Sequence, residues 1–76
     1  MSEIENKLQY LFDNSKIIKN KSFLLNSLKK KQFSLIYISS RIELVYFFFL
    51  DMSTNNLYRV TSPYLIKWQI NPLEYF

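Results

Sequence analysis

The side chains in this chain that could do chemistry are lysines, aromatic rings and a few carboxylates. Its 76 residues include no His, no Cys and no Gly. The chain therefore lacks the side chain that titrates near neutral pH, the thiol nucleophile and the soft metal ligands. Without Gly it also lacks the loops in which backbone amides close around a phosphate. These absences argue against the commonest enzyme classes, and we expect no cofactor and no metal site.

The carboxylates do not form a recognisable catalytic pattern. Three of the six acids fall in the first 13 residues and three are widely separated: Glu3, Glu5, Asp13, Glu43, Asp51 and Glu74. No spacing among them predicts that two meet in space, and no His is present to act as their partner. Because general acid–base catalysis needs such a pair, we predict that the protein is not an enzyme.

The basic residues are concentrated in one part of the chain. Residues 14–42 contain seven of them and no acid: Lys16, Lys19, Lys21, Lys29, Lys30, Lys31 and Arg41. One interpretation is a surface that binds the phosphates of RNA or DNA, and another is a surface for an acidic protein. A third is a solvated segment, because residues with AT-rich codons make up half of the chain and Lys accumulates in AT-rich genes. Arg, the usual base-reading residue, occurs only twice.

The aromatic content is high for the length. Aromatic residues make up 18% of the chain, and hydrophobic residues 49%. A domain of this size buries only about 60% of its unfolded surface, so we expect several rings to remain exposed for a partner. The candidates for partner contact are Phe47, Phe49, Trp68, Tyr75 and Phe76. Phe47 and Phe49 suit a core or an interface equally, Trp68 suits the core better, and base stacking by the strand aromatics is a third interpretation.

Two helices are predicted in the first half. Ser2 and Glu5 have the spacing of a capping box, and an apolar stripe follows at Ile4, Leu8, Leu11 and Phe12. This amphipathic helix should end near residues 14–15. A second, short helix is expected over residues 23–30, with Ser22 as its N-cap and lysines complementing its C-terminal dipole.

From Gln32 the apolar period changes to two, which predicts strands. Phe33, Leu35 and Tyr37 should share one face, with Ile36 and Ile38 on the other. Residues 39–41 are expected to form a tight connection to a central strand over 42–51, which is apolar on both faces. Residues 53–56 form the natural turn, since Asn tolerates positive φ, and residues 57–60 return as a third strand.

The last segment fits two structures. Ser62 and Pro63 are typical of a helix start, whereas apolar and polar residues alternate over 64–70 with Leu65 as the exception. We favour a fourth strand there. The predicted fold is a single α+β domain over residues 1–76, with the N-terminal helix packed on an antiparallel meander of three or four strands.

The expected function follows from spare aromatic surface in a small domain. We predict a non-enzymatic protein–protein interaction protein: a small subunit or accessory factor of a larger complex, or an inhibitor encoded by a phage or mobile element. The alternative is an RNA-binding module that uses the lysine-rich segment 16–31. A homodimer through an open strand edge or the C-terminus is a further alternative. The acidic start and the short apolar runs predict no export signal and no membrane span, hence the cytoplasm of an AT-rich host or an organelle interior.

Overall fold

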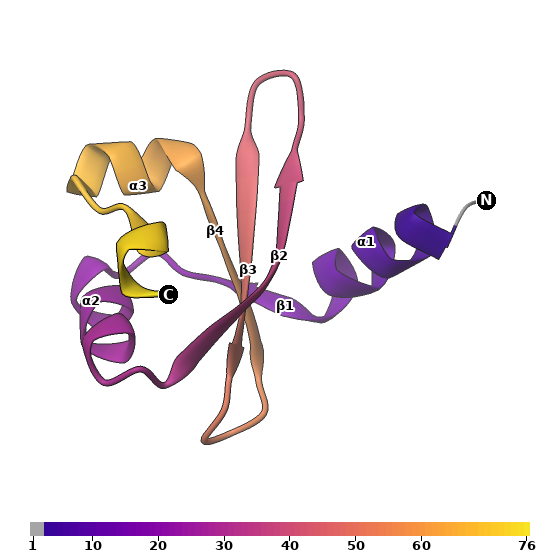
Figure 1. Cartoon of the computed structure of the whole chain (residues 1–76). Coiled ribbons are helices and arrows are strands. Elements are labelled where there is room, and N and C mark those ends of the chain that lie inside the picture. The colour runs from indigo at the N-terminus through magenta and orange to yellow at the C-terminus, as the bar shows by residue number, and fades with distance from the viewer. Residues whose placement is uncertain (1–2) are drawn as a thin grey trace.

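The protein is an α+β fold with three helices on a four-stranded mixed sheet. A computed structural model describes residues 3–76, without the side chain of Ile4. Its elements are α1 (Glu3–Asn14), β1 (Ser15–Ile17), α2 (Lys21–Lys29), β2 (Phe33–Ser40), β3 (Val45–Asp51), β4 (Leu57–Thr61), α3 (Ser62–Trp68) and the 3-10 helix η1 (Pro72–Tyr75). The strands lie in the order β1-β4-β3-β2. Helices α2, α3 and η1 lie on one side of the sheet and α1 on the other (Figure 1).

The predicted meander is confirmed. β2, β3 and β4 pair antiparallel in sequence, and Asn55 provides the positive φ (63°) in the second turn. The first turn was predicted at residues 39–41, which is wrong. Ser39 and Ser40 stay paired with β3, and Arg41 N donates to Leu44 O (2.8 Å), so the chain reverses at residues 42–43 instead.

The predicted faces of β2 are wrong after Leu35, because the strand has a register shift there. Leu35 lies opposite Phe49, but Tyr37 lies opposite Phe48, so β2 has one extra residue between them. Because side chains alternate along a strand, an inserted residue moves everything after it to the other face. Tyr37 therefore does not share a face with Leu35; its ring lies 6.2 Å from that of Phe48.

The fourth strand is β1, and residues 64–70 do not form it. β1 pairs parallel with β4 on the side of β4 that faces away from β3, and Ile18 N donates to Arg59 O (2.9 Å). The chain after β4 forms α3, with Pro63 in its first turn and Gln69 in the left-handed region (φ 58°) at its C-cap. Leu65, the exception to the alternating pattern, is the residue that α3 buries.

The first two helices lie close to their predicted positions. α1 ends at Asn14, as expected, whereas the predicted capping box involves Ser2, which lies outside the described residues. α2 begins two residues earlier than predicted, and its N-cap is Asn20 rather than Ser22. The Asn20 side chain accepts a hydrogen bond from Phe23 N (3.2 Å), which leaves Ser22 inside the first turn.

The central strand is covered on both faces, as its apolar pattern requires. On the α2 side the core consists of Ile18, Leu24, Leu28, Phe33, Phe49, Val60 and Leu65. On the α1 side Phe12 makes edge-to-face contacts with Tyr46 (4.8 Å) and with the buried Phe48 (5.3 Å). Within residues 3–76, no helix has both the length and the apolar character needed to cross a bilayer.

Candidate interaction surface

The outer edge of β2 is the most distinctive surface of the fold. β2 lies at the end of the strand order, and no described strand pairs with its outer side. Its eight residues carry no charge. Arg41 N donates to Leu44 O across the hairpin, and alternate residues of an antiparallel strand direct their backbone groups to opposite sides. The N–H and C=O of Ile38 and Ser40 therefore point outward.

The same rule applies at the other end of β2. Met52 N donates to Gln32 O (2.9 Å), so the backbone groups of Phe33 and Leu35 also point away from β3. The outer edge thus presents two outward residues on each side of the register shift, over the whole length of the strand.

Apolar side chains continue this edge on the α2 side of the sheet. Ile38 is 42% exposed and lies opposite the half-buried Phe47, while Phe76 is 52% exposed with its ring 5.8 Å from that of Phe49. Leu35, also half-buried, lies opposite Phe49. We call Leu35, Ile38, Phe47 and Phe76 the β2 patch.

The aromatic residues singled out from the sequence divide between core and surface. Phe49 is 0% exposed, so the core interpretation holds for it. Phe47, Trp68 and Tyr75 are half-buried and pack against the core on the α2 side, with Trp68 also 5.3 Å from the ring of Tyr64. Phe76 has the most exposed surface of the five. The structure thus brings Phe47 and Phe76, but not all five residues, to the β2 patch.

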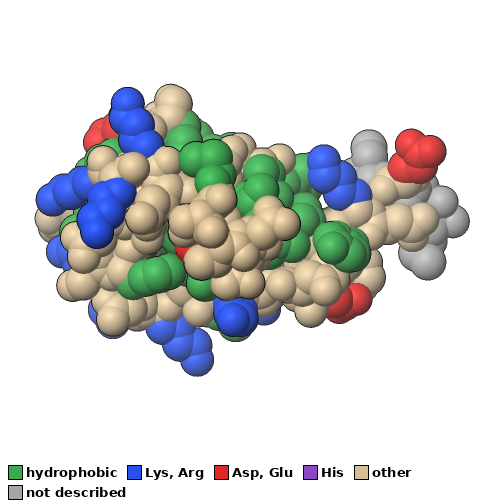
Figure 2. All heavy atoms as spheres, turned by 90° about the horizontal axis from the view of Figure 1, so that it is seen from below, with side chains coloured by type: hydrophobic (Ala, Val, Ile, Leu, Met, Phe, Trp, Pro, Cys, Tyr) green, Lys and Arg blue, Asp and Glu red, His purple; other side chains and the backbone are tan. Residues whose placement is uncertain are grey.

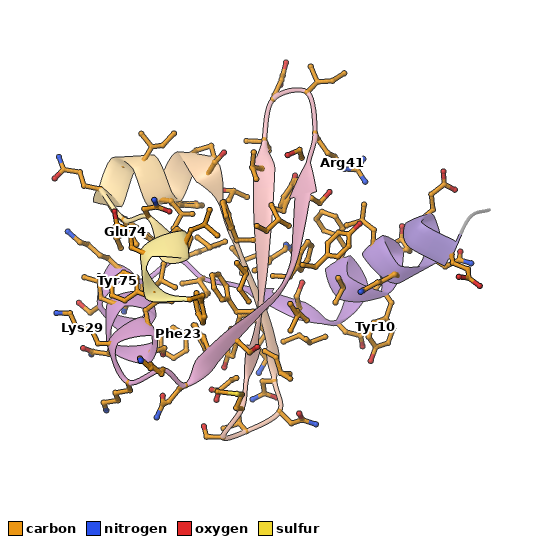
Figure 3. All side chains as sticks on the ribbon, viewed as in Figure 1. Tyr10, Phe23, Lys29, Arg41, Glu74 and Tyr75 are labelled. Carbon is orange, nitrogen blue, oxygen red and sulfur yellow. The ribbon has the colours of Figure 1, made fainter. Side chains whose placement is uncertain are left out.

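The seven predicted basic residues are all exposed, but they do not form one group. Five lie in or beside α2 and are called the α2 lysines: Lys19, Lys21, Lys29, Lys30 and Lys31. Lys16 lies on β1, and Arg41 lies at the far end of β2 from Lys29 (Figure 3). Figure 2 shows basic side chains gathered at the end of the molecule that carries α2, with acidic ones mainly toward the N-terminus. No α2 lysine pairs with an acid of residues 3–76.

The sequence analysis missed Arg59, which attaches α1 to the sheet. Its Nη1 donates to Phe12 O (3.0 Å), Ser15 O (3.0 Å) and Ser15 Oγ (2.8 Å), and its guanidinium lies 5.2 Å from the centre of the Phe12 ring. α1 has no basic residue in its own last turn, so a residue of β4 supplies the cation there. The only signal in the sequence was a lone Arg within an otherwise uncharged strand.

Two hollows lie near the tip of the β2–β3 hairpin, one on the hairpin itself and one between α1 and Arg41, and Arg41 borders both. One, of about 520 Å3, is lined by Arg41, Ile42, Glu43, Leu44 and Tyr46; the other, of about 400 Å3, is lined by Glu5, Asn6, Leu8, Gln9, Phe12 and Arg41. Neither lining brings a nucleophile together with a base. The hollows offer apolar surface bordered by basic, acidic and amide side chains.

Asp51 is the one buried acid of the described residues, and it has a structural role. Its Oδ1 accepts hydrogen bonds from Ser53 Oγ (2.7 Å) and Ser53 N (3.0 Å) in the β3–β4 turn. The Ser53 hydroxyl, opposed by partial desolvation, lowers the pKa of the Asp51 carboxyl below its ordinary value. The carboxylate therefore stays ionised and fixes the turn.

Comparisons of the chain with protein-family models, with curated proteins and with solved structures find no match. The fold is therefore interpreted from its own geometry. In that geometry the β2 edge, the β2 patch and the α2 lysines are candidate surfaces for a partner.

Proposed function

We propose that this protein is a non-enzymatic interaction protein, which acts by binding another protein through the outer edge of β2 and the β2 patch. The observation that carries the proposal is an uncharged edge strand of eight residues, open along its outer side, with exposed Ile38 and Phe76 beside it. Open strand edges are sites where a second chain adds on, and they are usually kept short or charged. A small subunit or an inhibitor suits such a surface.

The binding energy would come from apolar burial and from backbone pairing. Covering the exposed parts of Ile38 and Phe76 would contribute roughly 1–3 kcal/mol in total, and each backbone hydrogen bond formed at the β2 edge about 0.5–1.5 kcal/mol. The α2 lysines would steer an acidic partner toward this side and raise the association rate. The mechanism is adhesive and steric, with no chemical step.

The second candidate function is nucleic-acid binding through the α2 lysines. The observation that favours it is an uneven charge distribution. The five α2 lysines have no acidic partner among the described residues and share their end of the molecule with Glu74, whereas Glu3, Glu5 and Asp13 lie on α1 (Figures 2 and 3). Each lysine that neutralises a phosphate would add to the salt dependence of binding. β3, which carries the strand aromatics, has no basic residue, and this weakens a base-stacking role for those rings.

Affinity capture from the native host's lysate, with and without nuclease, separates the two functions. The tagged wild-type protein is compared with Ile38→Glu and with the matched control Ile66→Glu, which makes the same change at a residue that is 76% exposed on α3. We expect a stoichiometric protein companion that survives nuclease, is lost with Ile38→Glu and is retained with Ile66→Glu.

Two results would contradict this proposal. A companion captured equally well by Ile38→Glu would place the interface elsewhere. Companions that disappear with nuclease would support the second candidate, and reversing the charges of Lys29, Lys30 and Lys31 should then abolish binding together with its salt dependence. For a protein partner, the same reversal should mainly slow association.

A further inference from the structure

We infer that the partner binds as an additional β-strand along the outer edge of β2, through an extended segment with acidic residues at the end that lies next to Lys29–Lys31. This inference rests on the proposed function and names the chemistry of the partner. It follows from three features of the edge: its outward backbone groups, its lack of charge, and the lysines that precede it.

The backbone geometry favours a strand as the ligand. Phe33, Leu35, Ile38 and Ser40 direct their N–H and C=O groups away from β3, and an extended chain is the ligand whose own backbone groups match such a row. Eight residues of strand span about 26 Å, which is long enough for several paired hydrogen bonds. The side chains of Ile38 and Phe76 then provide apolar contacts for alternate residues of the added strand.

The charges around the edge favour an acidic ligand. β2 itself is uncharged, but Lys29, Lys30 and Lys31 come just before it, are all exposed and have no acidic partner among the described residues. An added strand lies about 4.8 Å from β2, well within the screening length of about 8–10 Å in physiological salt. At the other end Arg41 is close in sequence to Glu43, so the two charges offset each other.

A second copy of the chain fits this edge less well. Parallel pairing of two β2 strands would place the two sets of Lys29–Lys31 side by side, and like charges at such distances repel. Antiparallel pairing would place these lysines near Arg41 and Glu43, whose summed charge is zero. Neither arrangement neutralises the lysines.

The test uses synthetic peptides with the full-length protein. The probe is a fluorescent peptide of four Thr-Val repeats with three Asp at each end; one control has Lys in place of Asp, and another carries N-methyl groups on alternate core amides. Fluorescence anisotropy should show saturable binding of the Asp peptide, about tenfold weaker binding of the Lys peptide and none of the N-methylated one. Absence of binding by the Asp peptide overturns the inference, whereas capture of a companion that depends on Ile38 would leave the proposed function intact.

Protein variants test the backbone directly. Because the Ile38 N–H faces outward, Ile38→Pro removes a donor from the outer edge without removing a bond to β3, and Ile38→Ala is the matched control for loss of the side chain. We expect a loss of tenfold or more with Pro but only about threefold with Ala. Equal losses would indicate side-chain docking and overturn the inference. If the Pro variant does not fold, the N-methylated peptide carries the same test from the ligand's side.

Hydrogen exchange identifies the occupant. Adding the Asp peptide should protect the amides of Ile38 and Ser40, and binding should weaken about tenfold when Lys29, Lys30 and Lys31 are changed to Glu. Protection of these amides without peptide, together with a dimer in sedimentation, would show that a second copy occupies the edge. Tighter binding of a 12-nucleotide oligouridine, lost in the Lys-to-Glu variant, would assign the lysines to nucleic acid. Either result overturns the inference.

Discussion

Replacing Arg59 by Ala should release α1 from the sheet. α1 projects away from the body of the protein, and its C-terminal end lies nearest the strands (Figure 1). There the Arg59 guanidinium donates to carbonyl groups of Phe12 and Ser15 and to the Ser15 hydroxyl. Ala removes the donor, so these half-buried acceptors lose a charged partner and the end of α1 loses its cation.

The size of the effect follows from these contacts. Nη1 carries two hydrogens, so its three acceptors amount to about two charge-assisted hydrogen bonds, worth roughly 1.5–3 kcal/mol each before the ordering of the side chain is subtracted. Stacking on the Phe12 ring adds about 0.5–1 kcal/mol. Because Arg59 is half-buried, we expect a net loss of about 2–4 kcal/mol in the free energy of unfolding. A domain of this length has about 4–11 kcal/mol in all.

Thermal unfolding followed by circular dichroism measures this loss. For a domain of this size each kcal/mol corresponds to about 4–8 °C, so the expected loss of about 2–4 kcal/mol should lower the melting temperature of the Arg59→Ala variant by about 8–32 °C. Arg41→Ala is the matched control: it removes the same charge and side chain, and the Arg41 guanidinium also lies over the Phe12 ring (5.9 Å), but the hydrogen bonds to Phe12 and Ser15 come from Arg59. It should change the melting temperature by a few degrees at most. A melting temperature for Arg59→Ala within about 3 °C of wild type, or equal to that of Arg41→Ala, would refute the argument.

Three further predictions concern the core, a left-handed residue and the buried acid. Leu24→Ala should lower the free energy of unfolding, measured with urea, by about 2–5 kcal/mol because Leu24 is 0% exposed. Leu73→Ala, at a half-exposed position, should change it by no more than about 0.5 kcal/mol. Similar losses for the two variants would contradict the assigned core. Gln69→Gly should raise stability by about 0.5–1 kcal/mol because Gly adopts the left-handed backbone of this C-cap without strain, and a loss would argue against that conformation. A carboxyl whose folded-state pKa is lowered stabilises the fold above its unfolded pKa and loses that contribution as the pH falls through the folded value. The free energy of unfolding of the wild type, measured with urea, should therefore decrease as the pH falls below about 4. Asp51→Asn removes the carboxylate bound by Ser53, so this variant should be less stable at neutral pH and should lose part of the pH dependence. An unchanged pH profile would exclude the role of Asp51.

The elements that could be predicted from the sequence are those whose structure follows from their own local pattern of residues. The stripe that includes Leu8, Leu11 and Phe12 predicted α1 and its end at Asn14, because one helical face recurs with a local period. The alternating and continuous apolar runs predicted the meander in the same way, and Asn55 was expected at positive φ because the chain has no Gly for its turn. For the candidate site, two residues predicted to contact a partner differ in exposure: Phe76 is 52% exposed, whereas Tyr75 is half-buried and packs against the core. The predicted basic residues are all exposed, and their binding role stays a prediction.

The remaining features depend on contacts between distant segments. The extra residue that turns Tyr37 to the α1 side is defined only by its pairing with β3, and β1 is a strand only because β4 offers it an edge. The burial of Leu65 makes residues 62–68 a helix although they alternate like a strand, because packing outweighs a weak local pattern. The local sequence pattern therefore determined that this is an α+β fold with an N-terminal helix and an antiparallel meander. The tertiary structure decided that Phe49 fills the core, that Arg59 holds α1, and that β2 is an open edge, because each depends on which distant segment covers which face.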